Sequence, residues 1–272
     1  MFDYFKAQYR SFFKKDEPIK EEQVGSGSDK LTEKEKQEVL SIIQKKREEE
    51  LKKPPTIAII GKTGVGKSST INSLFSTNLG VSHFEACTQK ATPVTVTNGK
   101  GEIVIYDMPG LGEDEDKDKE HKLEYEKILP QCDVVLWIMN VADREMSSQQ
   151  GYIREVMVYL EGRIVICANK ADNVHPQDWN TTYNLPSDEQ HIYLEKRIDN
   201  IRKGIIKVVP QLSEELIVYY SATKRYKLDA LFGAMLAACP KHRGWVLNDR
   251  IDLADFSELI DKDVLKKISN GK

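Results

Sequence analysis

Short apolar runs alternate with helical patterns through the middle of the chain. From Thr56 onward, each apolar run has the length and β-branched content of a buried strand. The runs are Thr56–Ile60, Pro93–Thr97, Glu102–Tyr106, Val134–Met139, Ile164–Ala168 and Leu216–Tyr220. Helical stretches separate most of these runs, which predicts parallel strands joined by crossover helices. The pattern therefore predicts a doubly wound α/β sheet.

The second and third runs are joined by a much shorter connection. Asn98-Gly99 lies between them, and this dipeptide is typical of a two-residue hairpin turn. These two strands are therefore expected to pair antiparallel.

A separate helical pattern precedes the first strand. Thr32 and Glu35 have the spacing of a capping box, and strong helix formers continue from there to Lys53. Pro54 and Pro55 should end this helix, because proline lacks a donor and restricts the residue before it.

The two ends of the chain also have amphipathic spacing. Residues 2–15 place aromatic side chains among lysines and arginines, and residues 253–268 repeat apolar positions at helical intervals. The first segment could contact a partner helix, its own domain or a membrane surface. The predicted organisation is an N-terminal helical extension with a linker, a central α/β domain and a C-terminal helical tail, over residues 1–53, 54–239 and 240–272.

Composition adds few constraints. The chain has 272 residues and a net charge of −3, so no overall basic bias indicates nucleic-acid binding. No apolar run reaches the roughly 18 residues of a membrane span. The four cysteines form no CxxC pair, and no secretory signal is recognisable. We expect a cytoplasmic protein, with peripheral membrane contact as the alternative for residues 2–15.

The first strand leads into Gly61-Lys-Thr-Gly-Val-Gly-Lys67-Ser68, which fits GxxxxGK[ST]. Its glycines let successive N–H groups point at a β-phosphate. Lys67 adds charge near the β- and γ-phosphates, and Ser68 offers a hydroxyl to Mg²⁺ at a helix N-terminus. The candidate nucleotide-binding residues here are Lys62, Thr63, Gly64, Val65, Gly66, Lys67, Ser68 and Ser69.

The third strand leads into a second candidate motif, Asp107-Met-Pro-Gly110. A carboxylate at this strand end can hold Mg²⁺ through water, and the Gly110 N–H can bind a γ-phosphate. The hairpin before it should bring Asp107 beside Lys67.

Asn169-Lys-Ala-Asp172 follows the fifth strand, at the edge of an α/β sheet where ligands bind. The Asp172 carboxylate can accept two hydrogen bonds from guanine, which adenine cannot offer. The stem of Lys170 can lie across the base, and Asn169 can tie this loop to the first motif. A backbone N–H for guanine O6 can come from the loop after the last strand, Ser221, Ala222 and Thr223.

In this order the motifs resemble the Ras-like P-loop GTPases of the translation-factor-related class, in the Era-like and septin-like branch with a GTPase domain of the 50S ribosome-binding type. The resemblance covers about residues 56–238. It implies a three-layer α/β domain whose six-stranded sheet is mostly parallel with one antiparallel strand. It also implies GTP or GDP with Mg²⁺ as ligands, and catalytic roles for Lys67, Thr88 and Gly110. The tail is too short for the KH RNA-binding module that Era carries.

The family also uses a switch I threonine that reaches Mg²⁺ only when the γ-phosphate is present. Cys87-Thr-Gln-Lys90 is similar to the Era-like signature, so we assign this role to Thr88, with Thr92 as the alternative. The implied metal ligands are then Ser68, Thr88 and Asp107.

One position departs from the Ras-like pattern. Leu111 stands where many relatives have a glutamine that orients water, and this replacement implies slow hydrolysis. The missing group would come from an activating protein, from a second copy in a GTP-dependent homodimer, or from another switch residue. The leading hypothesis is a slow GTP hydrolase acting as a molecular switch. The alternative is an assembly module controlled by nucleotide, with little intrinsic hydrolysis.

Two further segments leave alternatives open. The acidic residues 113–120 are expected to form a mobile, solvated loop, or a docking surface for a basic partner. The long loop 173–190, which carries Trp179 and Tyr183, is expected either to pack locally or to contact a partner beside the base site.

Overall fold

A computed structural model of the chain describes residues 32–75, 91–98, 101–110, 115–143 and 146–250. The chain up to Glu49 forms one compact unit, and the chain from Glu50 forms a second. The predictions for residues 2–15 and 253–268, and those for Thr88 and Leu111, lie outside the described residues. Among the described helices, none has an apolar stretch long enough to cross a bilayer.

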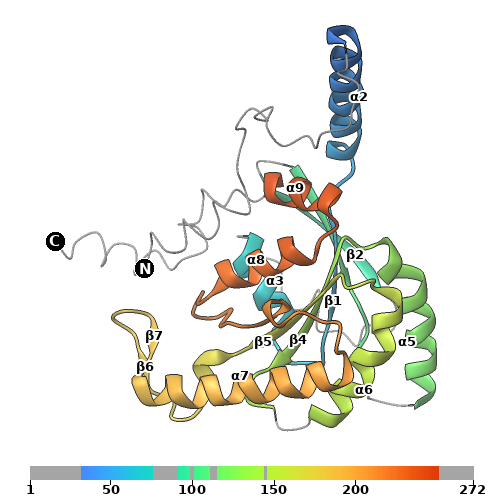
Figure 1. The fold of residues 1–272 in the computed structure, drawn as a ribbon. Coiled ribbons are helices and arrows are strands. Elements are labelled where there is room, and N and C mark those ends of the chain that lie inside the picture. Colours follow the sequence, from blue (N-terminus) through green and yellow to red (C-terminus); the bar gives the residue numbers. More distant parts are fainter. Residues whose placement is uncertain (1–31, 76–90, 99–100, 111–114, 144–145, 251–272) are drawn as a thin grey trace, which may run out of the picture. The chain divides into compact units, whose positions relative to one another are not determined.

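The second unit is built on one sheet with the strand order β2-β3-β1-β4-β5-β8 (Figure 1). Its strands are β1 Thr56–Ile60, β2 Thr92–Asn98, β3 Gly101–Asp107, β4 Val134–Asn140, β5 Ile164–Asn169 and β8 Ile217–Tyr219. β1 pairs parallel with both β3 and β4, whereas β2 pairs antiparallel with β3. The predicted six-stranded, mostly parallel sheet with one antiparallel strand is confirmed.

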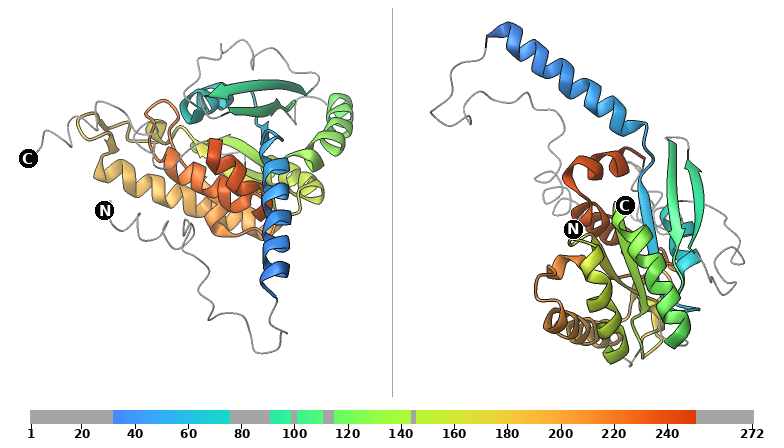
Figure 2. Two further views of the ribbon diagram at one scale, coloured as in Figure 1. Left: turned by 90° about the horizontal axis from the view of Figure 1, so that it is seen from above. Right: turned by 90° about the vertical axis from the view of Figure 1, so that its right-hand side faces the viewer.

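Helices cover both faces of this sheet, which gives a three-layer arrangement (Figures 1 and 2). α3 packs with α8, and α6 packs with α7. The helices are α3 Lys67–Phe75, α5 Glu115–Ile128, α6 Met146–Val156, α7 Asp188–Val208, α8 Leu228–Ala238 and α9 Lys241–Arg250. Short 3-10 turns lie at Leu129–Gln131, Met157–Tyr159, Ala171–Asn173 and Glu214–Leu216.

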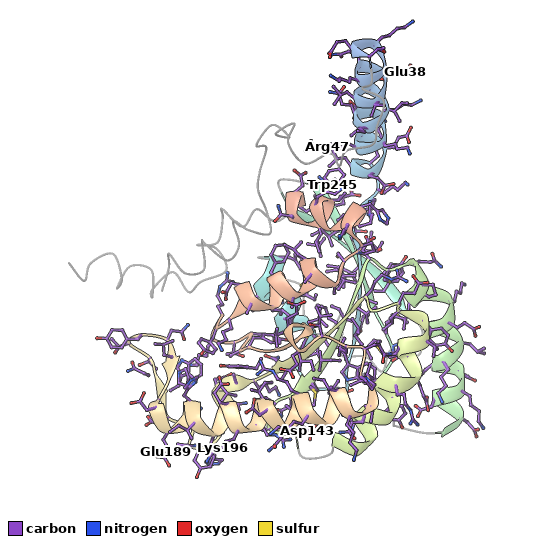
Figure 3. All side chains as sticks on the ribbon, in the orientation of Figure 1. Glu38, Arg47, Asp143, Glu189, Lys196 and Trp245 are labelled. Carbon is purple, nitrogen blue, oxygen red and sulfur yellow. The ribbon has the colours of Figure 1, made fainter. Side chains whose placement is uncertain are left out.

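The core lies between these layers. β4 and β5 are buried on both faces, which explains their continuous apolar sequences. Trp137 and Cys167 lie inside this core. α7 turns apolar residues such as Leu194 and Ile198 inward, while Glu189 and Lys196 point outward from the same helix (Figure 3). Amphipathic helices on a buried sheet thus fix the positions of the strand ends.

The helix predicted before the first strand is α2, Glu33–Leu51. It begins directly after Thr32, whose carbonyl accepts the N–H of Lys36 at 3.0 Å. It ends shortly before Pro54 and Pro55, as their restricted backbone requires.

The structure bears on two loop predictions. The prediction that residues 113–120 form a loop is wrong from Glu115 onward, because helix α5 begins at that residue. Acidic side chains in a first helical turn interact favourably with the helix dipole, and Asp116 pairs with Lys119 at 2.7 Å. The segment 173–190 packs locally, since it contains a two-stranded hairpin, β6 Trp179–Asn180 and β7 Leu185–Pro186. Contact between this segment and a partner stays a prediction.

Candidate nucleotide-binding site

The loop between β1 and α3 requires its glycines. Gly64 and Gly66 have φ values of 80° and 97°, in a region that side chains disfavour. A Cβ on Gly66 would come 2.4 Å from the Asn169 amide nitrogen, and one on Gly61 would come 2.5 Å from the Ile138 carbonyl oxygen. The loop is therefore closely packed against Asn169 and Ile138, and only glycine fits at positions 61 and 66.

The loop ends in the N-terminus of α3, which begins at Lys67. The Lys67 ammonium donates to the Gly61 carbonyl at 3.0 Å, so its stem folds back over the loop. Ser68 is buried on the first turn, and Val65 is buried within the loop. Lys62, Gly66 and Lys67 are half-buried, and Thr63, Gly64 and Ser69 are exposed. N–H groups at a helix N-terminus, with a lysine beside them, favour an anion.

Asp107 and Gly110 lie against this loop. Asp107 is completely buried at the end of β3, where it pairs in register with Ile59 of β1. A Cβ on Gly110 would lie 3.6 Å from the Gly61 carbonyl oxygen, so the two motifs are in contact. The Ser68 hydroxyl and the Asp107 carboxylate are hard oxygen ligands, and this donor set fits Mg²⁺.

Of the two switch I candidates, only Thr92 lies within the described residues. Its backbone opens β2 directly opposite Asp107. The assignment of Thr88 over Thr92 stays a prediction.

Asn169 connects three parts of the site. Its amide nitrogen donates to the Val65 carbonyl at 2.9 Å, and its amide oxygen accepts the Ala222 N–H at 3.1 Å. The side chain is only 2% exposed. Since these bonds lie inside the protein, Asn169 holds the first loop and the loop after β8 in fixed positions.

Asp172 follows on a short 3-10 turn. Lys170 precedes this turn in a left-handed conformation with φ of 65°. The Asp172 Oδ1 atom is buried, and no described residue donates a hydrogen bond to it. Buried carboxylate oxygens are normally hydrogen-bonded, so this atom fits a ligand that brings its own donor.

The loop after β8 lies beside this turn. Ser221 and Tyr226 exchange backbone hydrogen bonds, and the Ser221 hydroxyl accepts the Lys224 N–H at 3.0 Å. Ser73 of α3 donates to the Ala222 carbonyl at 2.9 Å. The fold thus brings together the first loop, Asp107, Asp172 and residues 221–223, all of which the sequence singled out.

Residues 56–170 match a protein family described as 50S ribosome-binding GTPase. These residues have the P-loop GTPase fold. The chain resembles YkfA of Escherichia coli K12, an uncharacterised protein, with 34% identity over 125 residues, 45% of this chain and 43% of YkfA. It is 31% identical to the uncharacterised E. coli protein YfjP over 146 residues, 53% of this chain and 50% of YfjP. GTPase Era of Treponema denticola is 26% identical over 187 residues, 68% of this chain and 56% of that protein. The chain thus spans about half the length of these relatives.

Solved GTPase structures share the fold. Era in complex with MgGDPNP and ribosomal RNA superposes with a TM-score of 0.51 at 23% identity, over 69% of this chain and 57% of that one. Toc33 of Arabidopsis thaliana with GDP and Mg²⁺ gives 0.52 at 19% identity, over 76% of this chain and 92% of Toc33. At these identities the likeness shows the fold alone.

In this GTPase domain, α5 holds the segment 107–110 with contacts that the sequence analysis missed. The His121 Nδ1 atom lies 2.9 Å from the Gly110 carbonyl oxygen. The Tyr125 hydroxyl donates to the Pro109 carbonyl, and burial raises the pKa of Tyr125, which keeps it a donor. His121 and Tyr125 have i, i+4 spacing, so both side chains lie on one helical face. Recognising residues 115–128 as a helix would have revealed this pair.

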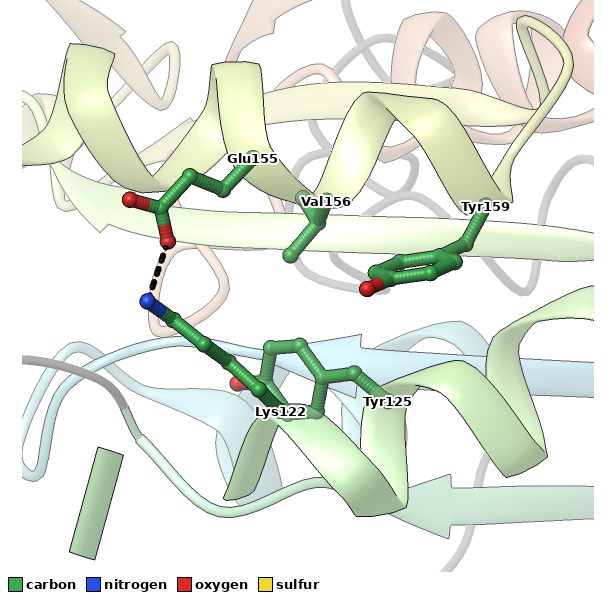
Figure 4. A pocket seen from close by; sticks show the side chains of 5 residues that line it. All are labelled: Lys122, Tyr125, Glu155, Val156 and Tyr159. Carbon is green, nitrogen blue, oxygen red and sulfur yellow. Dashed lines mark ion pairs between the residues drawn. The ribbon is translucent and has the colours of Figure 1, made fainter. Parts of the chain in front are cut away.

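A pocket of about 250 Å³ lies between α5 and α6 of the GTPase domain (Figure 4). It is lined by Lys122, Tyr125, Glu155, Val156 and Tyr159. An ion pair of 2.8 Å joins Lys122 to Glu155 across it. None of the predicted nucleotide-binding residues lines this pocket.

Proposed function

We propose that this chain binds GTP and GDP with Mg²⁺, hydrolyses GTP to GDP and phosphate slowly, and acts as a molecular switch. The buried Oδ1 atom of Asp172 is the observation that supports guanine most directly, because it has no donor among the described residues. Guanine N1–H and its amino group would supply that donor pair. Adenine has an acceptor at N1 and no amino group at position 2, so it leaves the carboxylate unsatisfied.

Other residues of the domain support the binding of the phosphates and Mg²⁺. The N–H groups of the glycine loop and the Lys67 ammonium bind and orient the β- and γ-phosphates. Ser68 and Asp107 would hold the metal. Mg²⁺ held there would supply positive charge beside the phosphate oxygens. Gly110 presents its N–H to the γ-phosphate, so the conformation of the segment 107–110 depends on whether the γ-phosphate is bound.

Leu111 supports the slow rate. A leucine side chain cannot orient an attacking water, so the isolated domain lacks a group that speeds hydrolysis. We propose that a second copy of the chain, in a GTP-dependent dimer, or a separate activating protein supplies it. Dimerisation is important for the GTPase activity of the chloroplast component Toc33, whose structure superposes with a TM-score of 0.50.

Nucleotide titrations of Asp172→Ala test the base assignment. Each charge-assisted bond to guanine contributes roughly 1.5–3 kcal/mol, so this variant should lose most of its affinity for both GTP and GDP. Affinity for ATP should change little. Asp178→Ala, which removes an exposed carboxylate from the following loop, serves as the matched control and should bind GDP like the wild type. Unchanged GDP affinity in Asp172→Ala would defeat the guanine assignment.

A second candidate function is an assembly module that binds GTP but barely hydrolyses it, and Leu111 favours this alternative too. Single-turnover hydrolysis at low and high protein concentration separates the two. A rate that rises with concentration supports a dimer that completes its own site. A rate near zero at every concentration, with intact GTP binding, supports the assembly module.

A further inference from the structure

The hairpin β6–β7 follows Asp172 in the chain, near the N-terminus of α7 (Figure 1). Its tip is ordered by Asn180, whose side-chain oxygen accepts the N–H groups of Thr182 and Tyr183 at 3.0 and 3.2 Å. Asn184 then takes a left-handed conformation with φ of 53°. This turn directs the Asn184 side chain toward the rest of the domain.

Asn184 joins the hairpin to the loop after β8. Its amide nitrogen donates to the Lys224 carbonyl at 2.7 Å, and its amide oxygen accepts the Trp179 indole N–H at 3.0 Å. Trp179 also meets the Tyr226 ring edge-on, with centroids 5.1 Å apart. The hairpin therefore contacts residues 224–226, immediately after the tripeptide predicted to face guanine O6.

The other end of the same segment is fixed to the Asp172 turn. Gln190, the buried residue in the first turn of α7, donates from its amide nitrogen to the Asp172 carbonyl at 3.1 Å. It also donates to the Val174 carbonyl at 2.8 Å. One continuous segment, 173–190, is thus bonded to both loops that are predicted to contact the base.

The loop after β8 needs such support. Arg225 and Lys227 both have positive φ values, 50° and 55°, although neither is glycine. Such conformations are unfavourable for residues with a side chain, and they persist only where surrounding contacts enforce them. The Asn184 bond to Lys224 and the Trp179 contact with Tyr226 provide these contacts beside the strained positions.

We infer that Asn184 is a positioning residue for guanine specificity, which acts by holding the loop 221–226 at the O6 edge of the base. This inference rests on the proposed guanine-nucleotide function. A backbone N–H of residues 221–223 can select guanine O6 only when it is held within hydrogen-bond distance of that atom. The bond from Asn184 to Lys224 fixes the loop at the very next residue, so it affects this contact with the base. The phosphates and the metal are bound from other loops. Asn184 should therefore influence affinity for the base and leave the chemical step unchanged.

Two variants isolate this role. Asn184→Asp keeps the shape and the tolerance for positive φ, but it replaces the donor to the Lys224 carbonyl by an acceptor. Asn184→Gly removes the side chain and also tolerates this backbone. Tyr183→Ala is the matched control, because Tyr183 neighbours Asn184 in the hairpin and is 64% exposed.

Dissociation constants are measured for GDP and for the diphosphate of 2-aminopurine riboside, a guanosine analogue that lacks O6 and the N1–H; the loss of N1–H affects wild type and variants alike, so the comparison is the change that each variant causes for each ligand. Both Asn184 variants should weaken GDP binding by roughly 3- to 10-fold, as expected for one lost hydrogen bond. The same variants should weaken binding of the analogue by less than about twofold, since only the O6 contact depends on the hairpin. Single-turnover GTP hydrolysis at saturating GTP should stay unchanged. Tyr183→Ala should match the wild type.

Equal losses for GDP and the analogue, or no loss for either, would overturn the inference and leave the proposed function standing. A wild-type protein that fails to bind GDP would instead overturn the proposed function itself. The wild-type titration therefore separates the two failures.

Discussion

Replacing Arg243 by alanine should weaken the contact between α9 and the sheet. The Arg243 guanidinium is buried and binds both carboxylate oxygens of Asp133, at 2.9 and 3.2 Å. It also pairs with the Glu50 carboxylate at 3.0 Å. Three backbone carbonyls complete its shell, those of Glu50, Lys53 and Pro54, at 3.2, 3.1 and 3.0 Å. One side chain thus connects α9, the start of β4 and the segment before β1.

The expected cost follows from what the substitution leaves behind. Asp133 is only 9% exposed, and it would keep the Thr56 N–H at 2.8 Å but lose its cation. Removing one partner of a buried ion pair costs about 3–5 kcal/mol, chiefly because the other charge stays buried. Typical domains unfold at about 5–15 kcal/mol. Arg243→Ala should therefore remove a large part of the stability of the second unit.

Urea unfolding followed by circular dichroism measures this loss. Lys241→Ala is the matched control, because Lys241 is an exposed cation on the same helix, and it should change the free energy of unfolding by less than about 0.5 kcal/mol. The double variant with Asp133→Ala should be less destabilised than the sum of the two single variants. A loss below about 1 kcal/mol for Arg243→Ala would refute this reasoning, because it would mean that Asp133 finds solvent or another partner.

Three further outcomes can be checked on the same protein. Burial lowers the pKa of Lys227 in the folded protein to about 8. Between that pH and about pH 10 the unfolded chain keeps the Lys227 proton that the folded protein has lost, so the free energy of unfolding should rise with pH over this range. Urea titrations across the range should show this rise for the wild type and a flatter curve for Lys227→Met. His121→Ala should slow GTP hydrolysis about tenfold by freeing the Gly110 peptide, whereas stopped-flow GDP binding should stay unchanged; a normal rate would contradict that role. Gly66→Ala should abolish nucleotide binding in calorimetry, because its Cβ would lie 2.4 Å from the Asn169 amide and φ is 97°; GDP affinity near that of the wild type would show that the loop can relax.

The sheet and its order of motifs were predictable because their signals are local. β4 and β5 are uninterrupted apolar runs, and the dipeptide Asn98-Gly99 in the sequence marks the only antiparallel pair in the described six-stranded sheet. Each motif directly follows a strand, and parallel strands bring their carboxyl ends to one edge. The positions of Lys67, Asp107 and Asp172 around one site follow from that rule.

Other features had no local signal. Residues 115–128 are so strongly charged that no apolar stripe distinguishes the helix α5 from a solvated loop. Arg243 and Asp133 bond to one another although 110 positions separate them. The bond from Asn184 to Lys224 likewise spans 40 positions. Pairings of this kind arise from tertiary packing, and a single sequence does not reveal which distant polar groups meet.

Calorimetric titration of Asp172→Asn with GDP and with xanthosine diphosphate tests the central claim most directly. Xanthine differs from guanine by a carbonyl in place of the 2-amino group, and the asparagine amide can donate to that carbonyl where the Asp172 carboxylate can only accept. The wild type should prefer GDP, and the variant should prefer xanthosine diphosphate by roughly tenfold or more. If both proteins rank the two nucleotides alike, Asp172 does not contact the base and the chain is not a guanine-specific binder through this site.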